Sequence, residues 1–179
     1  MIPKKVEQAI NKQINAELWS GYLYLSMSAY FEDLSLSGFA HWMRCQAREE
    51  TDHAMRLYYH LAERGGRIQL DAIKPVQTQW KSPLDVFQET YTHETKVTKM
   101  INDLLELSMK EKDHATANML QWFIDEQVEE ENSADDIVQK LKLIGKDGRG
   151  LLMIDRDLGQ RTYTPSPDLP PPTGSKAGE

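Results

Sequence analysis

Acidic residues and one histidine interrupt four otherwise apolar stripes of this sequence. The interruptions are Glu17, Glu50, His53, Glu94, Gln127 and Glu130. An ionised carboxylate is costly to bury alone, and several that face one another raise each other's pKa. Bound cations relieve this cost, and oxygen ligands with one imidazole and no thiolate suit iron or manganese, and also zinc. The pattern therefore predicts a cation site in the protein core rather than a polar layer that only fixes helix register.

The spacing of these residues requires helices. Glu50 and His53 are three residues apart and would share one helical face. Apolar residues recur at spacings of three and four along almost the whole chain, which predicts four long helices and a shorter fifth. We expect these helices to span about 3–33, 37–64, 83–112, 114–144 and 148–160, with proline and serine near starts and glycine after ends.

The lengths of the connections predict the topology. Short links join the first helix to the second and the third to the fourth, so each pair should form an antiparallel hairpin. Residues 67–83 have no helical period. About 17 extended residues can span ~55 Å, whereas a thirty-residue helix rises ~45 Å, so this segment can run the length of a bundle. The sequence predicts an all-α four-helix bundle with one long crossover, in which the polar interruptions meet at one level.

Four stretches of the chain resemble the bacterial-type non-haem ferritins. They read NAELWSGYLYLSM, REETDHAMRLYYHLAERGG, FQETYTHE and LQWFIDEQVEEE, and the resemblance covers residues 3–160. It implies a ferritin-like bundle that oxidises Fe(II) with dioxygen or hydrogen peroxide at a di-iron ferroxidase centre. It also implies a homo-oligomeric cage of 24 subunits that stores Fe(III) mineral. Thr51 stands where a bacterioferritin has its haem-ligating methionine, so no haem is expected.

The resemblance also assigns ligands to the two irons. Glu17, Glu50 and His53 would hold one iron. Glu50 would bridge to a second iron, which Glu94 and Glu130 would hold.

Further roles are implied for residues beside these ligands. Gln127 would orient a bound water or dioxygen species, and Tyr24 would lie beside the centre, where it could donate an electron. Glu49, Glu126 and Glu129 match the acids of a third iron site, although their spacing also suits a solvated helix face.

Composition excludes several other classes of function. The 179 residues carry a net charge of −7, which disfavours nucleic acid and anionic membranes as partners. The single cysteine, Cys45, permits no intrachain disulfide, and its neighbours in the sequence favour a packed thiol.

No stretch is long and apolar enough for a signal peptide or a membrane helix, so the cytoplasm is the expected location. Residues 1–160 are the expected domain, and residues 161–179 a Pro-rich flexible tail.

Three other classes of protein share parts of this pattern. A rubrerythrin-like oxidase or peroxidase would need a four-cysteine iron site, which one cysteine cannot make. A mini-ferritin of the DNA-protecting type places its metal between subunits, whereas the candidate ligands here fall within one bundle. A purely structural cage or interaction bundle would not need the acids, and the assembly size and Fe(II) oxidation would separate it from a storage protein.

Overall fold

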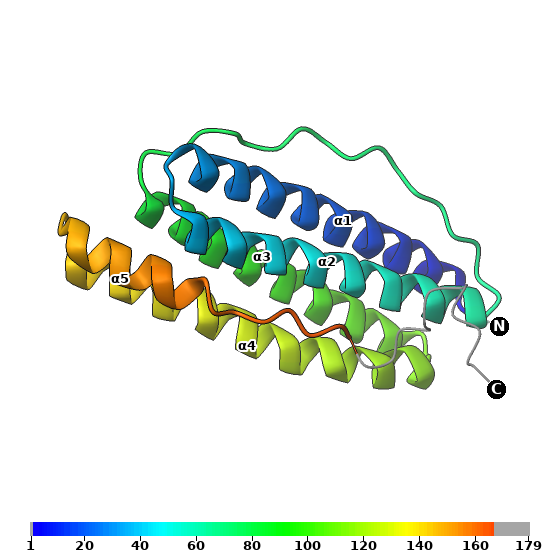
Figure 1. The fold of residues 1–179 in the computed structure, drawn as a ribbon. Helices are drawn as coiled ribbons and strands as arrows, with labels where there is room; N and C mark the ends of the chain where they lie inside the picture. The colour runs from blue at the N-terminus through cyan, green and yellow to red at the C-terminus, as the bar shows by residue number, and fades with distance from the viewer. Residues whose placement is uncertain (1, 167–179) are drawn as a thin grey trace, which may run out of the picture.

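The computed structural model describes residues 2–166, which form five helices and no strands. The helices are α1 (Lys4–Asp33), α2 (Ser37–Glu63), α3 (Pro83–Lys110), α4 (His114–Ile144) and α5 (Gly148–Leu158). The four long helices lie side by side, and the connection from α2 to α3 runs the length of the bundle beside α1 (Figure 1). The predicted all-α bundle with one long crossover and a short fifth helix is confirmed.

The helix ends follow local backbone chemistry. Ser82 caps α3 by accepting a hydrogen bond from the Asp85 amide, and Pro83 occupies the first helical position. The third helix ends at Lys110, two residues earlier than predicted, because Lys112 adopts a left-handed φ of 58° and Asp113 already caps α4. Gly145, with a φ of 56°, ends α4 as its sequence position predicts.

Asparagine side chains of α1 hold the crossover against the bundle. Asn11 donates to the Arg67 carbonyl at 2.9 Å and accepts from the Gln69 amide at 2.7 Å. Asn15 donates to the Asp71 carbonyl at 3.0 Å. These bonds satisfy backbone groups of a segment that has no secondary structure of its own.

The apolar core is split into two clusters by a polar level. One cluster lies toward the α5 end and includes Phe31, Phe39 and Phe87. The other lies toward the opposite end and includes Ile14 and Phe123. The stretch of each helix between the two clusters holds the buried residues Glu17, Glu50, His53, Glu94 and Glu130.

The fifth helix closes one end of the bundle by capping α2. Asp155 accepts hydrogen bonds from the amides of Gly38 and Phe39 at 2.8 and 3.0 Å, and so serves two donors at the start of α2. A Cβ at Gly38 would meet the Asp155 carbonyl oxygen at 1.6 Å, so the close approach requires glycine. None of the helices described is long and apolar enough to cross a membrane. Of the predicted C-terminal tail, residues 161–166 are described and 167–179 lie outside the described residues.

Candidate metal centre

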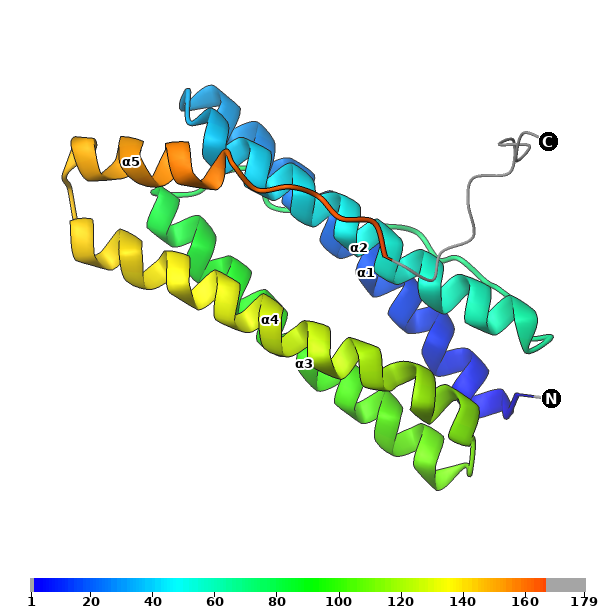
Figure 2. The ribbon, with the colours of Figure 1, turned by 60° about the horizontal axis from the view of Figure 1, so that its bottom comes forward.

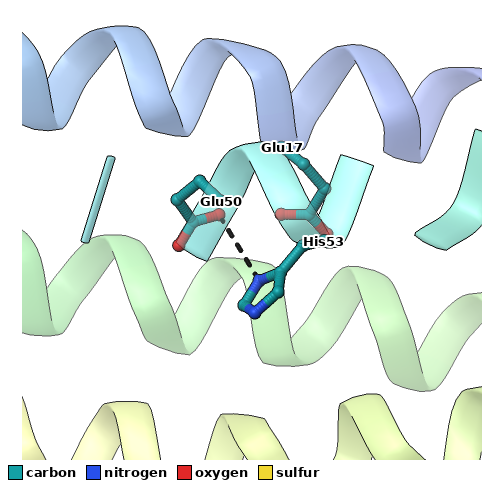
Figure 3. A group of neighbouring side chains, drawn as sticks. All are labelled: Glu17, Glu50 and His53. Carbon is teal, nitrogen blue, oxygen red and sulfur yellow. Dashed lines mark ion pairs between the residues drawn. The ribbon is translucent and has the colours of Figure 1, made fainter. Parts of the chain in front are cut away.

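The middle of the bundle brings together three of the predicted ligands. Glu17 reaches inward from α1, and Glu50 and His53 reach inward from neighbouring turns of α2 (Figure 3). One ligand atom from each of the three lies within 4.8 Å of the others, and Glu50 Oε2 is 3.8 Å from His53 Nδ1. Helical spacing of three residues produces this arrangement, because it stacks Glu50 and His53 one turn apart on the core face.

A second group shares the same histidine. His53, Glu126 and Glu130 also place one ligand atom each within 4.8 Å of one another. Glu130 is buried, whereas Glu126 is partly exposed on the neighbouring turn of α4. The two groups therefore adjoin at His53, and the second group lines a surface pocket with residues of α2 and α4.

Glu94 lies at the same level but is held by hydrogen bonds. Its Oε1 accepts from the Tyr24 hydroxyl, and its Oε2 accepts from Gln127 Nε2 at 3.3 Å. Gln127 also donates to Thr98 Oγ1 at 3.2 Å. These bonds fix the orientation of the Glu94 carboxylate and bring Tyr24 and Gln127 into contact with it.

Burial perturbs every ionisable group at this level. It raises the pKa of Glu50 and Glu130 well above the usual value, and the charge of Glu94 raises both further. Burial also raises the pKa of Glu94 to about 7. It raises the pKa of Tyr24 well above the usual value, and the charge of Glu94 raises that pKa further. It lowers the pKa of His53 to about 4, so this imidazole is neutral near pH 7 and has a lone pair for a metal.

Two buried carboxylate oxygens are left without a partner. Among the described residues, Glu17 Oε2 and Glu50 Oε2 accept no hydrogen bond from a third residue, and only a proton shared between the two carboxyls could pair them; the other oxygen of Glu17 accepts one from Gln13 at 2.8 Å. An unsatisfied buried acceptor costs roughly 1–3 kcal/mol, and more when it is charged. A cation between these oxygens and His53 would remove that cost, so the donor set fits a hard or borderline divalent metal.

The three acids assigned to a third iron site are in different environments. Glu126 and Glu129 line one pocket with Glu130 and His53. Glu49 lines it too, but its Oε2 is 2.5 Å from the guanidinium Nη2 of Arg161. Burial raises the pKa of Glu49, and Arg161 opposes that change.

The structure adds polar residues to which the sequence analysis gave no role. Gln46 donates to Glu130 Oε2 at 2.5 Å. Its position on the core stripe of α2, four residues before Glu50, was an available signal. His93 Nε2 lies 2.8 Å from Ser20 Oγ, and its ring meets that of Tyr24 edge-on at 6.0 Å. No periodicity marks His93, because it lies one residue before Glu94, off the core stripe of α3, and packs against α1.

A long-crossover bundle with buried carboxylates and a neutral imidazole at one level defines the ferritin-like class of metal-binding bundles. The family model of the ferritin-like domain matches residues 7–144. The chain therefore belongs to the ferritin family, and the predicted resemblance to bacterial non-haem ferritins is confirmed.

Individual relatives support the same assignment. The chain is 47% identical over 161 residues to the bacterial non-heme ferritin of Bacteroides fragilis strain 638R, covering 90% of this chain and 100% of the relative. It is 43% identical over 156 residues to that of Campylobacter jejuni, covering 87% and 93%. Among solved structures, an open-pore ferritin of the archaeon Archaeoglobus fulgidus superimposes with a TM-score of 0.90 at 52% identity, covering 90% of this chain and 100% of that one. Membership of the family supports a role in iron storage.

Proposed function

We propose that this chain is the subunit of an iron-storage cage that oxidises Fe(II) to Fe(III) at a di-iron centre inside each bundle. The observation that carries the proposal is the pair of unpartnered buried oxygens, Glu17 Oε2 and Glu50 Oε2, beside a neutral His53. A core that served only for packing would not leave carboxylates unsatisfied at its centre. The cage of 24 subunits is part of the same proposal and is supported by the likeness to ferritins over 90% of the chain.

Iron is the substrate in this proposal, and the side chains set its chemistry. Carboxylate oxygens are hard donors that stabilise Fe(III) relative to Fe(II), so binding favours loss of an electron. Two Fe(II) ions lose one electron each, and dioxygen takes both electrons with two protons to become hydrogen peroxide. Glu17, Glu50 and His53 would bind one ion, with Glu50 also facing the second, and Glu94 with Glu130 would complete the second position.

The surrounding residues would keep these ligands in place during turnover. The hydrogen bonds from Tyr24 and Gln127 fix the Glu94 carboxylate, and Gln46 fixes one oxygen of Glu130. Carboxylates of raised pKa must release their protons when a cation binds, so binding should weaken as the pH falls. Glu126 and Glu129 would form a third position on the route outward, next to Glu49.

Fe(II) oxidation by site variants tests the proposal. Aerobic addition of Fe(II) to iron-free protein should produce a rapid rise in Fe(III) absorbance. Glu50→Ala and His53→Ala should each lower the initial rate by at least about tenfold, because even residues outside the ligand shell of metal sites have effects of that size. Glu106→Ala removes an exposed acid of α3 and serves as the matched control. Unchanged rates in both site variants would refute the centre, and a stable monomer or dimer in size-exclusion chromatography would refute the cage.

A further inference from the structure

Residues 161–166, here called the C-terminal strap, run back along α2 after α5 ends (Figures 1 and 2). The strap is attached to α2 at both of its ends. The Arg161 carbonyl oxygen is 2.7 Å from His41 Nε2. The carboxylate of Asp52 accepts from the Tyr163 hydroxyl at 2.7 Å and from the Ser166 amide at 3.0 Å. Such fixed contacts give the strap a defined position relative to the metal centre.

The strap forms one wall of the pocket that His53 and Glu130 also line. This pocket has a volume of about 270 Å³. Helices α2 and α4 supply its acids, and the strap supplies Arg161 and residues 164–166. The acidic side chains that line it are Glu49, Asp52, Glu126, Glu129 and Glu130. A cation entering or leaving along this side of the bundle would therefore meet the strap.

Four contacts hold the guanidinium of Arg161 at the pocket wall, one of which is a hydrogen bond of 3.5 Å from Nη1 to the Trp42 carbonyl oxygen. Nη2 donates to Glu49 Oε2 at 2.5 Å, and Nη1 donates to Gln46 Oε1 at 2.5 Å. The guanidinium carbon lies 4.4 Å from the centre of the Trp42 ring. A planar group that stacks on one face and forks to two acceptors is well suited to hold a fixed position, which a lysine could not reproduce.

Gln46 connects Arg161 to the predicted ligand Glu130. Because the Gln46 carbonyl oxygen accepts from Arg161, its NH₂ group must point the other way, and it donates to Glu130 Oε2 at 2.5 Å. Arg161 thus contacts one acid of the pocket directly and orients the donor to another. Both contacts place positive charge or a hydrogen-bond donor where a metal ion would otherwise bind.

We propose that Arg161 is a positioning residue that occupies the cation position at Glu49, so that a third metal ion must displace its guanidinium to use this carboxylate. This inference rests on the proposed function, because it takes Glu126 and Glu129 as the rest of that third position. Competition from Arg161 makes the third position the weakest of the three. An ion there is bound transiently and passes on, while the site at Glu17, Glu50 and His53, none of which contacts Arg161, is unaffected.

Zn²⁺ binding to the iron-free, assembled full chain tests this competition without oxidation. Titration calorimetry at fixed pH should show that Arg161→Gln tightens the weakest class of Zn²⁺ sites by about tenfold, the scale of one charge-assisted hydrogen bond. The site at Glu17, Glu50 and His53 should keep its affinity. Glu49→Gln should abolish the gain when combined with Arg161→Gln, as expected for two groups in direct contact. Arg156→Gln removes an exposed charge from α5 and should change nothing.

Two results would overturn the proposal. The first is an unchanged affinity of the weakest sites in Arg161→Gln, with or without a lowered unfolding temperature, which would make Arg161 only a clamp for the strap. The second is a gain that persists in the double variant, since it would not come from Glu49. A different result would refute the proposed function itself. If Glu50→Ala leaves the Zn²⁺ affinity of the tighter sites unchanged, the di-iron centre is wrong, whatever Arg161→Gln does to the weakest sites.

Discussion

Glu94→Gln tests the energetic cost of the buried carboxylate level in the metal-free protein. Burial raises the pKa of Glu94 from 4.5 to about 7, with hydrogen bonds from Tyr24 and Gln127 opposing the rise. Between these two pH values the folded chain holds a proton that the unfolded chain has lost. Unfolding in this range therefore releases a proton, and the contribution of Glu94 to stability falls as the pH rises from 4.5 to about 7.

The size of this effect follows from the two pKa values. A difference of one pKa unit corresponds to 1.36 kcal/mol, so ionisation of Glu94 in the folded state costs about 3 kcal/mol above pH 7. A glutamine cannot ionise and does not incur this cost. Relative to the native protein, Glu94→Gln should gain about 3 kcal/mol between pH 4 and pH 8. The pKa of His53, lowered to about 4, produces an opposite trend, but this histidine is present in both proteins and its effect cancels in the difference.

Denaturant unfolding followed by circular dichroism measures the predicted difference. Both proteins are freed of metal with a chelator and compared at one protein concentration, because assembly makes the apparent stability depend on concentration. Glu106→Gln, an exposed residue of the same helix, should give a difference that does not change with pH. Zn²⁺ at pH 8 should stabilise the native protein more than Glu94→Gln, because the variant offers one carboxylate fewer.

A stability difference that is the same at pH 4 and pH 8 would refute this reasoning. It would mean that Glu94 ionises as readily in the folded chain as in the unfolded one. A growing loss of stability in Glu94→Gln with rising pH would refute it more strongly, since the charged carboxylate would then stabilise the metal-free core.

Two further predictions concern the α5 end of the bundle. Gly38→Ala should lower the free energy of unfolding by at least ~2 kcal/mol, because the added Cβ would clash with the Asp155 carbonyl. Ser37→Ala changes an exposed neighbour and is the control. Equal unfolding midpoints for the two variants would contradict the close approach. Phe39→Ala should cost about 3–5 kcal/mol, since its ring is fully buried and stacks on Phe31 at 5.0 Å. A cost below about 1 kcal/mol in thermal unfolding would show that the cluster refills the cavity.

The helices and the polar level could be predicted because they depend on local rules. Apolar residues at spacings of three and four define the core faces, and Ser82 and Gly145 mark helix ends through their own backbone chemistry. Once two antiparallel hairpins are joined by the long crossover, the position of Glu17, Glu50 and Glu94 near the middle of each helix sets them at one level. The small error at the end of α3 arose where Lys112 adopts a left-handed conformation that its residue type does not signal.

The contacts of Arg161 could not be predicted by the same rules. Its segment has no helical period, and the proline-rich sequence that follows it is typical of a flexible tail. The direction of the strap depends on where α5 docks, and that depends on Asp155 meeting Gly38, 117 residues away in sequence. Glu49 therefore reads as a metal ligand or a solvated acid from its position on α2, and only the folded chain reveals an arginine beside it.

The polar level and the strap represent two solutions to the same electrostatic problem. At the centre, no Lys or Arg side chain among the described residues forms an ion pair with Glu17 or Glu50. The nearby His53 does not supply a positive charge either, because burial keeps it neutral. Their charge can be balanced only by protons or by a bound cation, so metal affinity and pH dependence are linked there. At the pocket wall, the guanidinium of Arg161 balances the charge of Glu49 unless a cation displaces it. The carboxylates without a cationic partner thus lie at the centre, where two irons would react. The carboxylate that has one lies at the pocket wall, where an ion would leave. This arrangement favours metal binding at the centre over retention at the pocket wall.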